Sequence, residues 1–209
     1  HPEVLRLFML QSHYRSPVDY SDESLAEARA GLLRCYRTLQ LMKEQQGKLA
    51  AETRPVTGKR SERQDYYLTR FRELSDKFDE AMDDDFNTAQ ALGHVFEMVR
   101  LTNNVIAEEK NIPASDQDKI FAAARTVFDH FGAVLGVINS DADQFFAFYR
   151  DTELRKRGLK VDEIEELIKQ RQSARAKKDW ARADAIRQHL AGLNIVLKDS
   201  AQGTRWMIE

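Results

Sequence analysis

The window 169–187 carries the densest positive charge in the chain. It contains seven basic and two acidic residues, so its local net charge is +5. The basic residues are Lys169, Arg171, Arg175, Lys177, Lys178, Arg182 and Arg187, and the acidic ones are Asp179 and Asp184. Because the whole chain has a net charge of −2, contact with nucleic acid must come from a local patch of this kind.

The side chains of this window are of types that bind unpaired RNA. Arg171 and Arg175 are four residues apart, which aligns them on one helix face. Trp180, Asp184 and Arg187 share a face of the next predicted helix. An indole can stack on a base, a guanidinium can pair with a phosphate or a base edge, and a carboxylate can accept a hydrogen bond from an exocyclic amine.

A purely structural interpretation of the same residues is equally compatible with their spacing. Trp180 can cover the end of a helical hairpin, while Asp184 and Arg187 form an ordinary surface ion pair. Basic helical hairpins are common, so spacing alone favours neither interpretation.

Other residues with reactive side chains lack the partners that catalysis needs. The sequence has no Gly-rich phosphate loop, no nucleophile elbow and no close Cys/His spacing typical of a metal site. Cys35, within an apolar helical stretch, is predicted to be a buried, inert thiol. Asp83–Asp85 is predicted to be a turn before a helix. His13 lies in a polar loop without an acidic partner nearby in sequence, so catalysis is not indicated.

The composition is typical of a globular protein, with 42% hydrophobic and 32% charged residues. A single cysteine excludes a disulfide framework and fits a reducing compartment. The sequence has neither an apolar run long enough for a bilayer nor a signal peptide, so we expect a cytoplasmic location and no membrane contact. Because the chain starts at His1 instead of Met, we expect a fragment of a longer protein.

Helical periodicity dominates the first two thirds of the chain, which has only nine Gly and four Pro. Helices are predicted at 3–12, 21–44, 64–83, 87–106 and 115–135. A mobile loop is predicted at 46–63. Because the apolar stripes of these helices can be buried only against one another, we expect an antiparallel helical bundle.

Capping residues are predicted at several helix starts. Ser21 is a candidate cap, and Asn87 with Gln90 resembles a capping box. Ser115 with Asp118 is expected to open the last helix of the bundle.

The remaining residues are predicted to form a smaller module. A short helix within 140–160 leads to a hinge at Gly158, and its crowded aromatic residues are expected to be core packing. A helical hairpin follows, with a capping box at Asp162 and Glu165 and a cap at Asp179. The last residues alternate in polarity around Gly203, which predicts a β-hairpin on the helices.

The fold class is therefore mostly α: an antiparallel helical bundle followed by a small helical hairpin with a C-terminal β-hairpin. The predicted domains are 1–140, the helical bundle, and 161–209, the C-terminal module. Residues 141–160 form a linker.

Four segments resemble one family in the correct order. Residues 170–187 contain A-R-x-x-K-D-W and A-D-x-I-R, and 194–206 contain D-x-x-x-G-T-x-W. Residues 1–17 and the segment A-M-D-D-D-F-N-T at 81–88 match upstream elements. Over nearly its whole length the chain resembles the carboxy-terminal part of bacterial cysteinyl-tRNA synthetases.

The resemblance implies a bundle domain named after the motif Asp-Ala-Leu-Arg, followed by an anticodon-binding module. At the motif itself this chain reads Glu3-Val4-Leu5-Arg6. The resemblance implies tRNA(Cys) as the partner of a monomeric protein, and it implies a set of anticodon contacts. Arg171 is added to that set, and Trp206 is expected to be a structural or stacking neighbour. The predicted set is Arg171, Arg175, Trp180, Asp184, Arg187, Asp199 and Trp206.

The same resemblance implies that chemistry resides elsewhere in such an enzyme. The family activates cysteine with ATP and attaches it to tRNA, but its two nucleotide-binding signatures and its zinc-binding cysteines do not occur in this sequence. We therefore expect no cofactor in this chain, ATP and zinc in the missing catalytic domain, and no aminoacylation by this chain alone.

Two other functions remain open from the sequence. A non-catalytic scaffold or protein-interaction bundle would leave the basic hairpin merely solvated. A related cysteine ligase acting on a small amine is the other alternative, although an anticodon-reading module would have no purpose there.

Overall fold

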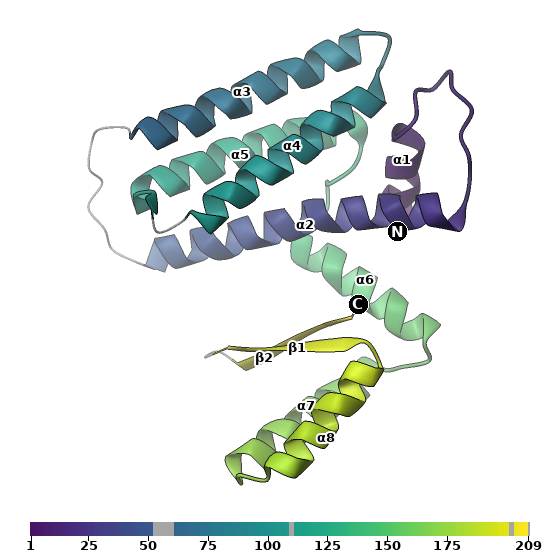
Figure 1. The fold of residues 1–209 in the computed structure, drawn as a ribbon, viewed down its shortest axis with the longest axis vertical. Helices are drawn as coiled ribbons and strands as arrows, with labels where there is room; N and C mark the ends of the chain where they lie inside the picture. Colours follow the sequence, from purple (N-terminus) through teal and green to yellow (C-terminus); the bar gives the residue numbers. More distant parts are fainter. Residues whose placement is uncertain (52–60, 109–110, 201–202, 209) are drawn as a thin grey trace. The chain divides into compact units, whose positions relative to one another are not determined.

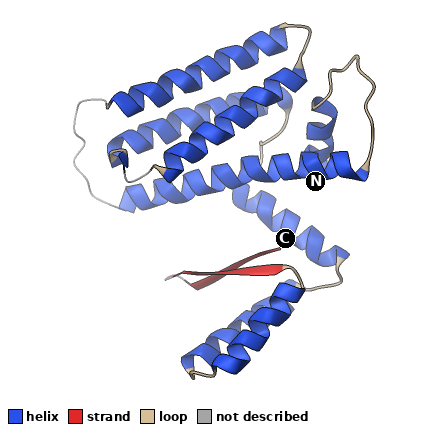
Figure 2. Ribbon diagram, in the orientation of Figure 1, coloured by secondary structure: helices blue, strands red, loops and turns tan. Residues whose placement is uncertain are grey.

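A computed structural model describes residues 1–51, 61–108, 111–200 and 203–208. The chain divides into two compact units, His1–Asp143 and Gln144–Glu209. The predicted fold class is confirmed, because helices make up most of the described residues and the two strands described form one small sheet (Figure 2). The predicted domain limits stay a prediction, because compactness alone does not define where a domain ends. No helix among the described residues is both long and apolar enough to cross a membrane.

The first unit is a helical bundle (Figure 1). Its helices are α1 Pro2–Leu10, α2 Asp22–Ala51, α3 Glu62–Asp83, α4 Thr88–Ala107 and α5 Ala114–Leu135. Helix α3 packs against α4 and α5, and α2 packs against α1, α4 and α5. The apolar stripe predicted for α3 is buried as expected, from Tyr67 to Phe78.

Aromatic packing fills the core of the bundle. Phe78 of α3 stacks on Phe131 of α5 with ring centroids 4.3 Å apart. Cys35 of α2 is buried, as predicted. Burial raises the pKa of its thiol to about 12, so the thiol remains protonated and unreactive near neutral pH.

Three of the predicted helix caps are confirmed. The Ser21 hydroxyl accepts a hydrogen bond from the Ser24 amide. The Asn87 side chain accepts one from the Gln90 amide at 3.2 Å. Gln90 does not complete the box, however, because its side chain binds the Asn87 side-chain amide instead of the Asn87 backbone. The third cap, Asp179, accepts from the Arg182 amide.

Two predicted caps are wrong. Helix α5 begins at Ala114 after Pro113, not at Ser115, and no side chain caps it. Proline fixes a φ suited to a helix start, which moves the boundary upstream. The helix expected to start with a box at Asp162 and Glu165 instead follows Lys160, again without a side-chain cap.

The predicted loop at 46–63 is partly wrong. Residues 46–51 continue α2, and 61–63 contain the Ser61 cap and the start of α3. The intervening residues 52–60 lie outside the described part of the chain. Helix α2 continues past Gly47 because an isolated glycine costs a helix only about 1 kcal/mol.

The charged residues of the Glu3-Val4-Leu5-Arg6 segment tie α1 to the chain that follows α5. The buried Glu3 carboxylate accepts hydrogen bonds from the Ile138 amide at 2.8 Å and from the Tyr36 hydroxyl of α2 at 2.8 Å. Arg6 donates to the backbone carbonyl of Gly136. The variant motif therefore joins three segments of the first unit.

The second unit contains most of α6 Ala142–Lys156, then α7 Val161–Ala176, α8 Trp180–Gly192, β1 Ile195–Ser200 and β2 Gly203–Ile208. Helices α7 and α8 form the predicted helical hairpin, and the strands pair antiparallel with Ile195 opposite Ile208. The core of this unit is formed by seven buried side chains: Leu154, Ile164, Ile168, Ile186, Leu190, Ile195 and Ile208. The expectation for the aromatic residues of α6 is only half right, because Phe145 is buried but Phe148 is exposed.

Candidate nucleic-acid interface

Asp199 of β1 is the centre of a polar cluster in the second unit. Arg171 of α7 donates two parallel hydrogen bonds to it, from Nη1 to Oδ1 at 3.0 Å and from Nη2 to Oδ2 at 2.8 Å. Arg175 Nη1 also donates to Oδ2 at 2.8 Å. The Thr204 hydroxyl of β2 donates to Oδ1 at 2.7 Å, and Gln172 donates to that hydroxyl. The cluster therefore joins both strands to α7.

The cluster forms because the pairing of the two strands and the spacing of the arginines along α7 bring these side chains to the same place. Asp199 and Thr204 are opposite each other in the β1–β2 ladder, so both side chains project from the same face of the hairpin. Arg171 and Arg175 are one helical turn apart, so both reach that face from α7. A fork of two N–H donors matches a carboxylate closely, which makes this the stronger kind of charged hydrogen bond.

Burial separates the two arginines that contact Asp199. The side chain of Arg171 is 7% exposed, whereas that of Arg175 is 46% exposed. Hydrogen bonds from Arg171 first, and then from Thr204, hold the pKa of Asp199 well below its usual range. The same pair raises the pKa of the Arg171 guanidinium. Asp199 is therefore a carboxylate at any physiological pH.

Trp180 is the first residue of α8 and lies at the tip of the helical hairpin. The chain turns there through a left-handed residue, Lys178, with φ 60°. Asp179 then caps α8, and its side chain accepts a hydrogen bond from the Arg182 amide. The Trp180 side chain is 59% exposed. The indole is therefore largely open to solvent, and its predicted contact with RNA stays a prediction.

Asp184 and Arg187 are exposed on α8, whereas Ala183, Ile186 and Leu190 of the same helix are buried. No ion pair between Asp184 and Arg187 occurs within the described residues, in contrast to the purely structural interpretation. Both side chains are therefore available to solvent. Their predicted role in contacting RNA is not tested by the structure and stays a prediction.

Trp206 of β2 is mainly a packing residue. It is opposite Leu197 in the hairpin, and both are partly buried against the core of the second unit. The guanidinium of Arg150 lies over its ring, 5.2 Å from the centroid. This is the arrangement of a cation–π contact. The structure thus favours the structural half of the prediction for Trp206.

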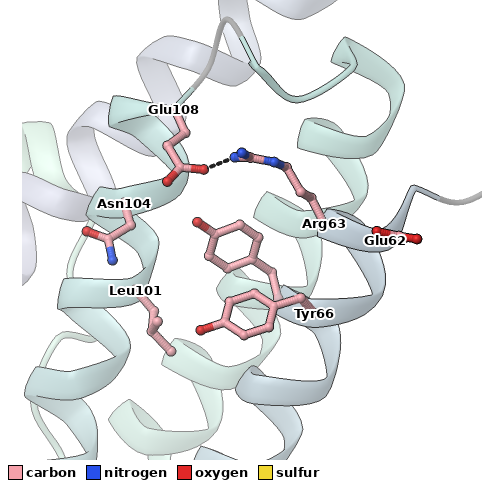
Figure 3. Close-up of a pocket in the computed structure, with 7 residues that line it drawn as sticks. Glu62, Arg63, Tyr66, Leu101, Asn104 and Glu108 are labelled. Carbon is pink, nitrogen blue, oxygen red and sulfur yellow. Dashed lines mark hydrogen bonds and ion pairs between the residues drawn. The ribbon is translucent and has the colours of Figure 1, made fainter.

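A pocket of about 340 Å³ lies in the first unit between α3 and α4 (Figure 3). Its lining includes Tyr66 and Tyr67 together with Arg63 and Glu108, which form an ion pair. None of the predicted site residues lines it. In the described part of the chain, no group of three or more His, Cys, Asp or Glu side chains could hold a metal ion.

Comparison with known proteins finds a family match within each of the two units. Residues 77–139 match the family described as the DALR domain, and residues 161–206 match the cysteinyl-tRNA ligase anticodon binding domain. A cysteine–tRNA ligase of Geobacter sulfurreducens is 42% identical over 207 residues, and one of Geobacter metallireducens is 43% identical over 208 residues. Each alignment covers 99% of this chain.

The predicted resemblance is confirmed. The chain is similar, over 99% of its length, to part of a cysteine–tRNA ligase, and its second unit includes the residues 161–206 that match the cysteinyl-tRNA ligase anticodon binding domain. It spans about 40% of the length of the curated relatives that it matches. A more distant cysteine–tRNA ligase, from Nitratidesulfovibrio vulgaris, is 36% identical over 206 residues.

The matched domain includes all seven predicted contact residues. The structure brings Arg171, Arg175 and Asp199 into direct contact, which sequence reasoning did not foresee. It also adds Thr204 and Gln172 to the cluster. Thr204 could have been found from its place in the G-T-x-W element, whereas Gln172 carries no distinguishing signal in the sequence.

Proposed function

We propose that this chain is the tRNA-binding region of a cysteine–tRNA ligase and that its second unit contacts the anticodon loop of tRNA(Cys). The observation that carries the proposal is the exposed indole of Trp180, at a basic hairpin tip inside an anticodon-binding domain. The exposed ring offers a face on which a splayed base can stack, and the basic side chains of the same hairpin can pair with phosphates.

Each exposed residue has a distinct role in this proposal. Trp180 stacks on an unpaired base of the anticodon loop. Arg175 and Arg187 pair with phosphates or with base edges, because a guanidinium can donate in pairs to either acceptor. Asp184 accepts a hydrogen bond from an exocyclic amine. The carboxylate also disfavours a base that presents only acceptors at that position, because two acceptors repel.

The bundle of the first unit serves as a rigid spacer between the anticodon and the site of chemistry. An anticodon contact then increases the rate by positioning the acceptor end of the tRNA, not by providing a reactive group. We propose that the ligase acts as a monomer in the cytoplasm. ATP and zinc would be bound outside the matched part of such a ligase, because this chain has a single, buried cysteine and lacks the nucleotide-binding signatures.

The test is binding of the 209-residue chain to a tRNA(Cys) transcript at several salt concentrations. Trp180→Ala and Arg175→Ala should each weaken binding by roughly 1–3 kcal/mol, the usual cost of losing one base stack or base contact. Phe148→Ala is a matched control, because it removes another exposed ring of the second unit that is outside the matched motifs.

The result also separates this proposal from the scaffold alternative. RNA affinity that decreases as salt is added supports the proposal, because cationic contacts release counterions from the phosphates. The absence of binding even at low salt would instead support a scaffold. Equal binding by the Trp180→Ala and Phe148→Ala variants, both folded by circular dichroism, would exclude the assigned contact.

A further inference from the structure

The Asp199 carboxylate has no unused acceptor position in the free protein. A carboxylate offers about four lone pairs, two on each oxygen. Oδ1 accepts from Arg171 Nη1 and from the Thr204 hydroxyl, and Oδ2 accepts from Arg171 Nη2 and from Arg175 Nη1. A base or ribose hydroxyl can therefore reach this carboxylate only if one of the present donors leaves.

The donors differ in how readily they can leave. Arg171 is 7% exposed and holds both carboxylate oxygens, so breaking its contact would leave a buried guanidinium without a partner. Arg175 makes a single hydrogen bond to Asp199 and is 46% exposed. Water or a phosphate can therefore replace Asp199 as its acceptor at small cost.

We propose that Arg171 is a positioning residue for tRNA recognition, which holds Asp199 and the β1–β2 hairpin against α7 while Arg175 exchanges its Asp199 contact for RNA. This inference rests on the proposed anticodon-binding function. It assigns different tasks to two arginines that are one helical turn apart. Arg175 leaves Asp199 for an RNA phosphate or base edge, and the lone pair that it frees on Oδ2 accepts from an amine or hydroxyl of the RNA.

The exchange explains why two arginines share one carboxylate. With Arg171 in place, Asp199 keeps a compensating positive charge after Arg175 has left, so it stays ionised and oriented. Without Arg171, Arg175 would be the one remaining arginine among the described side chains that contact Asp199, and it would bind Asp199 more tightly, in competition with RNA. Thr204, which donates to Oδ1, remains as a second constraint on the direction of the carboxylate.

The test compares Arg171→Lys, Arg171→Ala and Arg175→Ala in the 209-residue chain. Dissociation constants are measured for the tRNA(Cys) transcript and for a transcript with one changed anticodon base, each over a range of salt. Lysine keeps the charge of Arg171 but cannot form the two-bond fork. Arg70→Lys is the control, because Arg70 makes hydrogen bonds to Glu73 and Glu97 in the first unit.

Arg171→Lys should reduce discrimination between the two transcripts by roughly 5- to 100-fold, the range for one base contact, and leave the salt dependence unchanged. Arg175→Ala should reduce the slope of log Kd against log salt by about 1, as for a residue that contacts a phosphate. Arg70→Lys should change neither quantity. A loss of folding alone would weaken binding to both transcripts equally and would not alter their ratio.

The proposal is overturned if Arg171→Lys discriminates like the wild type, or if Arg175→Ala leaves the slope of log Kd against log salt unchanged. Hydrogen exchange of the β1–β2 amides provides a readout without RNA, and it should accelerate in both Arg171 variants and not in Arg175→Ala. If the wild type binds no tRNA, the proposed function fails. The hydrogen-exchange result then still decides whether Arg171 holds the hairpin, and unchanged exchange rejects this inference.

Discussion

Replacing Glu3 by Ala should strongly destabilise the first unit. The buried carboxylate accepts hydrogen bonds from the Ile138 amide and from the Tyr36 hydroxyl, each at 2.8 Å. Alanine removes the carboxylate that accepts both hydrogen bonds. A buried donor without a partner costs about 1–3 kcal/mol, so the two donors together predict a loss of about 2–6 kcal/mol.

Replacing Glu3 by Gln should cost less. The remaining amide oxygen can still accept from Ile138 and Tyr36, while the new NH2 group can donate to the Ser140 hydroxyl, which lies 3.4 Å from the wild-type carboxylate. Only the charge-assisted part of the two hydrogen bonds is then lost, which is about 1–2 kcal/mol in total. The order of stability should therefore be wild type, Glu3→Gln, Glu3→Ala.

Two optical signals make the assay specific to the first unit. Urea unfolding followed by circular dichroism reports all helices, whereas both tryptophans of the chain, Trp180 and Trp206, belong to the second unit. The circular dichroism transition should shift to lower urea, and the fluorescence transition should remain unchanged. Leu5→Ala, an exposed site on the same helix, is the control and should cost less than about 0.5 kcal/mol. Equal shifts for Glu3→Ala and Leu5→Ala would refute the reasoning.

Three other predictions follow from packing and charge. Gly132→Ala should cost about 1–3 kcal/mol in urea unfolding, because its methyl group would lie 2.8 Å from the Val137 carbonyl. Gly93→Ala should be neutral or stabilising, because among the described residues a methyl group there would meet no atom within 4 Å beyond its chain neighbours and the backbone of its own helix. The Cys35 thiol, with its pKa raised to about 12, should resist iodoacetamide at pH 8 until the chain unfolds, and alkylation of the native chain would contradict this. Because the pKa of Asp199 is lowered in the folded chain, the ionised carboxylate contributes its full free energy of stabilisation at any pH above about 3.9, the pKa of an unfolded Asp. This contribution is lost only as the pH falls through the lower pKa of the folded state. An NMR titration of the Asp199 carboxyl carbon with a midpoint near 3.9 would contradict this prediction.

The buried faces of the helices were predictable because the spacing of their apolar residues can be seen within a short stretch of sequence. Tyr67, Phe71, Leu74 and Phe78 recur every three or four residues, and all four are buried. The β-hairpin was predictable for the same reason, because alternation places Ile195 and Ile208 on the core side. Exact helix starts were less predictable. The cap residue at Ser115 competed with Pro113, whose backbone preference prevailed.

Long-range polar contacts could not be read from the sequence. Arg171 and Asp199 are separated by 28 residues, and their contact depends on how the hairpin docks on α7. Glu3 and Ile138 are separated by 135 residues, and nothing local distinguishes this glutamate from a solvated one. The family resemblance implied Asp199 as an anticodon contact and Arg171 was added to that set, but only the geometry shows that the two side chains are in direct contact.

Under the proposed function, the Asp199 cluster also makes RNA affinity and thermodynamic stability interdependent. A ligand that engages Trp180 on α8, Arg175 on α7 and Asp199 on β1 binds a surface that exists only while these three elements are assembled. By mass action, such a ligand at a hundred times its Kd adds about 2.7 kcal/mol to the unfolding free energy of the second unit. The thermal unfolding of this unit should therefore report how much RNA is bound, and the measurement requires neither a label nor a catalytic step.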